Sequence, residues 1–188
     1  MLILAVCAAM AVVSCSKKTV DLSAGDVEVI IPCSGPDYRT NKKHLRASGM
    51  GLSGDINIAK KKAMAEATAA LASHASSLVE RVATNYASSY QMSEAEESKQ
   101  KFEDMSKIVV KEKLSGISVI CEKVMRTQDG KYKAYIALEL VGSDLLEGIH
   151  QTMTRGMTGE NKLRIDYEYE KYKQEFDKEM ERLEKQGY

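Results

Sequence analysis

Large aromatic residues are scarce in this sequence: it has no tryptophan and only two phenylalanines among 188 residues. Many of the apolar residues are alanines instead, which favours close helix packing over a large aromatic core. A surplus of one charge is also missing, because 27 basic residues balance 27 acidic ones. Dedicated nucleic-acid binders usually carry a basic surplus. We therefore expect no nucleic-acid partner.

Catalytic and metal-binding motifs are missing as well. The three histidines, His44, His74 and His150, are scattered, and no two cysteines have the CxxC spacing of a zinc site. His74 has serines nearby, but a catalytic triad also needs an orienting group and an oxyanion hole. The acidic residues of 94–104 are interspersed with lysines, as on a solvated helix face. We therefore predict no enzyme activity, no catalytic residues, no metal and no cofactor.

No apolar run reaches the roughly 20 residues of a membrane-spanning helix, but the chain begins with a shorter one. Met1–Val13 is uncharged and almost entirely apolar, which suits the hydrophobic region of a signal peptide. Ser14 and Cys15 follow, and the sequence then becomes polar at Ser16. This order resembles a bacterial lipobox, in which a small residue admits the signal peptidase and the cysteine thiol carries the lipid. We predict a signal peptide over residues 1–14 and lipid attachment, including palmitate, at Cys15.

Two features depart from the usual export signal. No Lys or Arg precedes the apolar run, and a rival cysteine, Cys7, follows Val6, which is too bulky for the cleavage position. The alternative is a buried N-terminal segment with an incidental cysteine, but the abrupt change to polar residues at Cys15 favours the lipoprotein. Ser16 is not the aspartate that retains some lipoproteins on the inner membrane. We therefore expect an outer-membrane anchor with the chain facing the periplasm.

Cys33 and Cys121 are the only cysteines that follow Cys15. An oxidising envelope would allow them to form a disulfide. The alternative is that Cys121 is a small buried hydrophobe on a strand. Because sequence does not show whether two cysteines lie close together, we slightly favour the unpaired alternative.

The rest of the chain predicts four regions: a tether over residues 15–26, an α+β domain over 27–153, a break with glycines, and a helical extension over 160–188. Within the domain, Val27–Ile31 has a strand pattern and residues 44–52 can be extended. Alanines and larger apolar residues then recur every three or four positions over 56–91, which predicts one long helix capped by Asp55. A second helix is predicted over 93–113, with Phe102, Met105, Ile108 and Val109 on one face.

A hairpin follows, with strands over 117–126 and 131–141 joined at Asp129-Gly130, a strong turn signal. In the second strand Ile136 and Leu138 alternate with Lys133 and Glu139, so one face should be buried and the other mostly polar. A short helix is expected over 144–153. The predicted fold is α+β: a small antiparallel sheet in strand–helix–strand–strand order, packed by the long alanine-rich helix.

The charged C-terminal helix, residues 160–186, has a narrow apolar stripe. Its members are Ile165, Tyr169, Tyr172, Phe176, Met180 and Leu183. Such a stripe must be buried, either on its own domain or against another subunit. The sequence leaves both open, so we expect self-association or an envelope protein as partner.

Basic residues are concentrated between positions 39 and 62, and Asp55 is the only acidic residue in this range. The candidate residues for binding an anionic surface are Lys42, Lys43, Arg46, Lys60, Lys61 and Lys62. The alternative is a solvated face whose lysine stems cover apolar surface. We favour this alternative, since a balanced net charge weakens long-range steering.

Residues 44–149 resemble the small outer-membrane lipoprotein antigen family, often called "lipoprotein twenty". The matching motifs are Arg46-Ala47-Ser48-Gly49-Met50-Gly51, Ala59-Lys60-Lys61-Lys62-Ala63, Leu114-Ser115-Gly116-Ile117 and Lys133-Ala134-Tyr135-Ile136-Ala137. The resemblance implies a strand–helix–strand–strand module and brings no catalytic motif. Some members resemble components of flagellar disks at the outer membrane. We therefore expect a non-catalytic assembly or scaffold protein; the alternative is a binding module for an anionic wall polymer or a small ligand.

Overall fold

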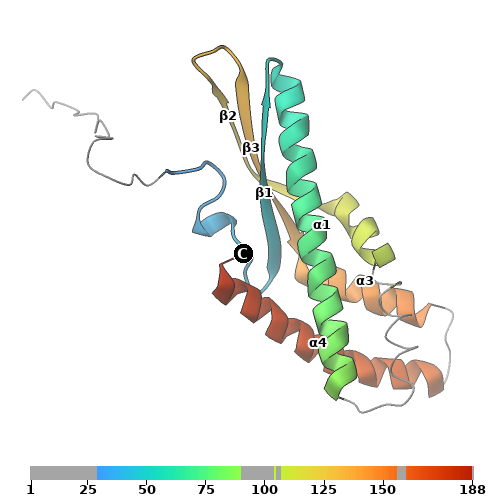
Figure 1. The fold of residues 1–188 in the computed structure, drawn as a ribbon. Helices are drawn as coiled ribbons and strands as arrows, with labels where there is room; N and C mark the ends of the chain where they lie inside the picture. Colours follow the sequence, from blue (N-terminus) through green and yellow to red (C-terminus); the bar gives the residue numbers. More distant parts are fainter. Residues whose placement is uncertain (1–28, 90–103, 105–106, 156–159, 188) are drawn as a thin grey trace, which may run out of the picture. The chain divides into compact units, whose positions relative to one another are not determined.

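The computed structural model describes residues 29–89, 104, 107–155 and 160–187 (Figure 1). The predicted signal peptide, Cys15 and the whole tether lie outside these residues. The chain divides into two units, Met1–Ile30 and Ile31–Tyr188, and the elements below all belong to the second unit.

The fold is α+β and contains a three-stranded antiparallel sheet. Its strands are β1 (His44–Ser53), β2 (Ser118–Arg126) and β3 (Tyr132–Val141), in the spatial order β1-β3-β2. The predicted hairpin is confirmed, and Gly130 at its turn has a φ of 81°, a value that favours glycine. The pairing of β2 with β3 is irregular between Val119 and Cys121.

The predicted long helix is α1 (Ile56–Ser89), which runs along the sheet in Figure 1. Its start is capped as expected, because Asp55 Oδ1 accepts the backbone N–H groups of Asn57 at 2.7 Å and Ile58 at 3.0 Å. The stripe that faces the core is fully buried: Ala59, Ala63, Ala67, Leu71, Ala75, Leu78 and Val82. Opposite it, β3 buries Ala134, Ile136, Leu138 and Leu140 in the same core. The predicted faces of both elements are thus confirmed.

Two glycines in β1 let α1 approach the sheet closely. A Cβ added to Gly49 would lie 2.5 Å from the backbone nitrogen of Ala67 and 2.6 Å from the carbonyl oxygen of Ala63. One added to Gly51 would overlap the carbonyl oxygen of Ala59. Strand and helix therefore pack backbone against backbone, which the combination of glycine and alanine permits.

Two predictions of secondary structure need correction. Val29, Ile30 and Ile31 are exposed and are not part of a strand; Pro32 lacks a backbone donor and the chain turns at Cys33, so the segment does not continue along the sheet. In the second predicted helix, residues 107–113 are helical, but Val109 and Val110 are buried while Ile108 is 56% exposed. The remaining core positions predicted there lie outside the described residues.

Two further helices, α3 (Gly142–Thr154) and α4 (Glu160–Gln186), complete the unit. The apolar stripe of α4 docks on its own chain: Tyr172, Phe176, Met180 and Leu183 are buried in the same core as α1 and the sheet. Burial raises the pKa of the Tyr172 hydroxyl well above its ordinary value. Of the two alternatives for this stripe, the structure shows packing within one chain.

A buried carboxylate also joins α4 to α1. Glu179 Oε2 accepts hydrogen bonds from Arg81 Nε at 3.2 Å and Arg182 Nε at 2.9 Å, and Oε1 accepts one from Asn85 Nδ2 at 3.1 Å. Glu179 is only 8% exposed, so these donors replace the water that its charge would otherwise bind.

Candidate functional site: the outer face of the sheet

The sheet has an outer face, which we define as the face opposite α1. The register places alternate residues of each strand on it. They are His44, Arg46, Ser48, Met50 and Leu52 of β1, Lys133, Tyr135, Ala137, Glu139 and Val141 of β3, and Cys121, Lys123 and Met125 of β2. The sequence correctly predicts the polar character of much of this face, but Ala137 is fully buried because another segment covers it.

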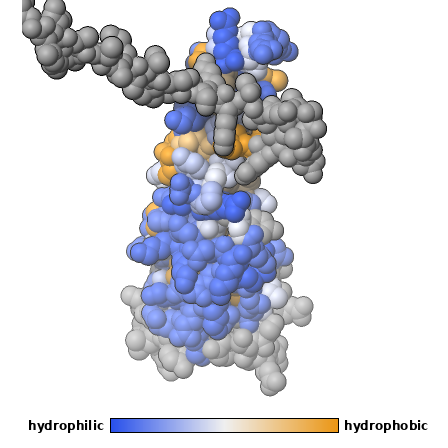
Figure 2. All heavy atoms as spheres, turned by 90° about the vertical axis from the view of Figure 1, so that its left-hand side faces the viewer, coloured by the Kyte–Doolittle hydropathy of each residue, from blue (hydrophilic) through white to orange (hydrophobic). Residues whose placement is uncertain are grey.

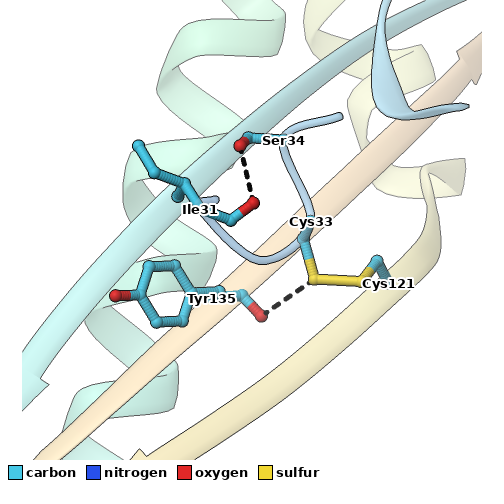
Figure 3. The surroundings of a disulfide bond; sticks show 5 residues. All are labelled: Ile31, Cys33, Ser34, Cys121 and Tyr135. Atoms are coloured by element: carbon cyan, nitrogen blue, oxygen red, sulfur yellow. Dashed lines mark hydrogen bonds between the residues drawn. A yellow bond between two sulfur atoms is a disulfide. The ribbon is translucent and has the colours of Figure 1, made fainter. Parts of the chain in front are cut away.

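That segment is held by a disulfide between Cys33 and Cys121 (Figure 3), whose Cα atoms are 5.6 Å apart. The slight preference for unpaired cysteines is therefore wrong: the turn at Cys33, with a φ of 57°, brings it onto β2. Ser34 Oγ supports the turn by donating to the carbonyl oxygen of Ile31 at 2.8 Å. Cys33 Sγ also lies 3.7 Å from the carbonyl oxygen of Tyr135. The bond thus ties the beginning of this unit to an edge strand.

A second attachment lies farther along the same segment. Arg46 Nη2 and Nε lie 2.6 Å and 2.7 Å from Glu139 Oε2, and Arg46 Nη1 donates to the carbonyl oxygens of Asp37 and Arg39. The side chains of Arg46 and Glu139 are both only 17% exposed. Thr40 Oγ1 accepts the backbone N–H of Arg46 at 3.0 Å. Arg46 therefore holds this segment against the sheet. Because these contacts occupy its guanidinium group, little of that group remains to bind an anionic surface.

The structure does not bring the six candidate basic residues into one surface. Lys42 and Lys43 precede β1, whereas Lys60–Lys62 lie in α1 beyond its other end, and ten strand residues span about 30 Å. Lys42 Nζ binds Glu181 Oε1 at 2.8 Å, and this hydrogen bond raises the pKa of Lys42. Lys60 Nζ pairs with Glu122 Oε1 at 2.5 Å, and Lys62 Nζ donates to the carbonyl oxygen of Leu52. A single large anion-binding patch is therefore not formed.

The other end of the outer face is open and partly apolar. Met50, Leu52 and Met125 are 42%, 40% and 48% exposed, and the register places them around Tyr135 and Lys133. Figure 2 shows apolar residues in the upper half of this side of the molecule, above a largely hydrophilic part. The alternation of side chains along residues 44–52 is the sequence signal that could have identified this surface, which was not predicted.

Within the described part of the chain, His, Cys, Asp and Glu form no group of three or more that could hold a metal ion. The described helices likewise include none with the length and apolarity to cross a bilayer.

No known family model, curated protein or solved structure matches this chain. The resemblance to the "lipoprotein twenty" family therefore rests on the motifs themselves. Two of them meet in the fold: Gly49 and Gly51 of the first pack against Ala59 and Ala63 of the second. The quoted motifs are thus partly explained by the contact between β1 and α1.

Proposed function

We propose that this chain is a non-catalytic, lipid-anchored protein of the bacterial cell envelope, held on the outer membrane through Cys15 and acting in assembly or as a scaffold. The observation that carries the proposal is the disulfide between Cys33 and Cys121. Disulfides persist in exported proteins and are rare in the cytosol. This supports export independently of the lipobox.

The position of the disulfide also suits an anchored scaffold. Cys33 is the first cysteine after the proposed lipid attachment site. Tension on an anchored N-terminus would therefore reach β2 through a covalent bond, and β1 through the hydrogen bonds that Arg46 donates to the carbonyl oxygens of Asp37 and Arg39. Such an attachment transmits force into the sheet without relying on hydrogen bonds alone.

Self-association through α4 receives no support, because the described part of its apolar stripe is already buried on its own chain. The scaffold role then requires another contact surface. We infer that the open end of the outer face, with Met50, Leu52 and Met125, contacts a second envelope protein. Exposed apolar residues gathered in one place are typical of such surfaces.

Photo-crosslinking in living cells tests this proposal. A crosslinking amino acid at Leu52 or Met125 should trap the same envelope protein, whereas the exposed α1 positions Ser76 and Glu80 should not. A Met50→Asp substitution should abolish the adduct formed from position 125 without reducing the amount of folded protein. Equal crosslinking from the outer face of the sheet and from the α1 positions would reject the scaffold role for this surface. The absence of any crosslink from the outer face would reject it as well.

A further inference from the structure

A shallow hollow of about 360 Å³ lies where β1 begins, β3 ends, and α3 and α4 meet. The start of β1 is distant in sequence from the other three elements, which follow one another along the chain. The lining residues are Lys42, Lys43, His44, Val141, Gly142, Ser143, Leu146, Lys173, Phe176 and Asp177. The hollow therefore combines charged side chains with apolar ones in one place.

Three of the charged groups form no ion pair within the part of the chain that the structure describes. Among the described residues, no ion pair includes Lys43, Lys173 or Asp177, although Lys173 and Asp177 lie one turn apart on α4. Lys42, by contrast, is occupied by Glu181 at 2.8 Å. His44 Nε2 lies 3.8 Å from Glu139 Oε1, and its Nδ1 is buried without a hydrogen-bond partner in the described structure. The hollow thus offers two unneutralised ammonium groups and one carboxylate.

The walls between these charges are apolar. Leu146 and Phe176 are 4% and 3% exposed and belong to the core, while Val141 at the end of β3 is 37% exposed. Val141 is therefore the apolar wall that water reaches, and a ligand that bears only charge would leave it in contact with water. A ligand that also carries an apolar group would cover it, which is favourable.

We propose that this hollow binds a phosphate-bearing zwitterionic headgroup of the phosphoethanolamine type. Lys43 and Lys173 would hold the phosphate, since lysine ammonium groups bind phosphate as point charges. Asp177 would hold the ligand's ammonium group, and the adjoining apolar part would lie against Val141. This binding site goes beyond the proposed scaffold role and does not depend on it.

Two sources share this chemistry: the headgroup of a membrane phospholipid and a soluble phosphate ester. NMR titration of the mature chain, made as residues 15–188 with Cys15→Ser, separates them. The probes are O-phosphoethanolamine, dihexanoyl-phosphatidylethanolamine, dihexanoyl-phosphatidylglycerol and inorganic phosphate. Amide shifts should be largest at Ser143, Leu146 and Lys173. Tighter binding of the short-chain lipid than of O-phosphoethanolamine assigns the site to lipid, and equal binding assigns it to a soluble ester.

Matched variants decide whether the hollow is the site. Lys43→Gln/Lys173→Gln should weaken binding of the tightest probe by about fivefold to tenfold, whereas Lys61→Gln/Lys111→Gln, at exposed positions elsewhere, should not. Asp177→Asn should remove the preference for phosphatidylethanolamine over phosphatidylglycerol, and Glu170→Gln should preserve it. Equal weakening by both lysine pairs, or binding of inorganic phosphate as tight as that of O-phosphoethanolamine, would overturn the proposal.

Discussion

Single residues at the contact between β1 and α1 determine how closely the two elements approach. Gly49 and Gly51 have backbone atoms of α1 where a side chain would be. The neighbours are backbone atoms of a regular helix, which cannot rotate away as a side chain can. A methyl group at either position therefore has to displace the whole helix.

We accordingly expect Gly51→Ala to destabilise the fold by about 1–3 kcal/mol, the usual cost of overpacking a well-packed core. Gly54→Ala is the matched control, because nothing lies within 4 Å of a Cβ at that position; it should change stability by less than about 0.5 kcal/mol. Urea denaturation of both variants measures the difference. Equal midpoints would show that α1 does not pack on β1 as described.

Residues on the two faces of β3 should also differ in their contribution to stability. Ile136 is 1% exposed in the core, so Ile136→Ala should lower the free energy of unfolding by about 2–5 kcal/mol. Lys133 lies on the outer face, and Lys133→Ala should cost less than about 0.5 kcal/mol. Comparable losses in thermal or urea unfolding would mean that the faces of the strand are reversed.

At the level of elements, two attachments hold segments that the β–α core alone would not fix. The disulfide holds the segment before β1, and Glu179 holds α4 against α1. Both connect parts of the chain that are far apart in sequence. Neither could be deduced from local patterns, which report only on neighbours along the chain.

Loss of the disulfide should destabilise the fold by about 2–5 kcal/mol, because the bond closes a long loop, with 88 residues of sequence separation, in the unfolded chain. Cys33→Ser, Cys121→Ser and the double variant should lose nearly the same amount, since each removes the same bond. Denaturation under non-reducing conditions measures the three. Effects that add in the double variant would show that the cysteines act separately.

Removing the Glu179 carboxylate should loosen α4 from α1. We expect Glu179→Ala to cost about 1–3 kcal/mol, because it removes the charged acceptor that Arg81 and Asn85 of α1 share with Arg182 of α4. Glu170→Ala, at an exposed position of the same helix, should cost less than about 0.5 kcal/mol. Hydrogen exchange at α4 amides should quicken in the first variant only; unchanged exchange in both would contradict the proposed role of Glu179.

At the scale of the whole molecule, periodicity predicted the strand–helix–strand–strand order along the chain, the alanine stripe and the hairpin, because each follows from local alternation and caps such as Asp55. The disulfide, the separation of the basic residues and the hollow depend instead on tertiary contacts. The pairing of Cys33 with Cys121 depends on the tertiary contact between the segment after Pro32 and β2, which local patterns do not report. The six basic residues are close in sequence, yet a strand of about 30 Å separates them. The hollow gathers Lys43 and Lys173, which the sequence keeps 130 positions apart.

The central claim is that lipid on Cys15 anchors this folded unit to the envelope. Metabolic labelling of cells with an alkyne analogue of palmitate tests it most directly. The wild-type chain and a Cys7→Ser variant should be labelled and should fractionate with the outer membrane. Cys15→Ser should lose the label. Equal labelling of the wild type and Cys15→Ser, or loss of label in Cys7→Ser alone, would contradict the claim.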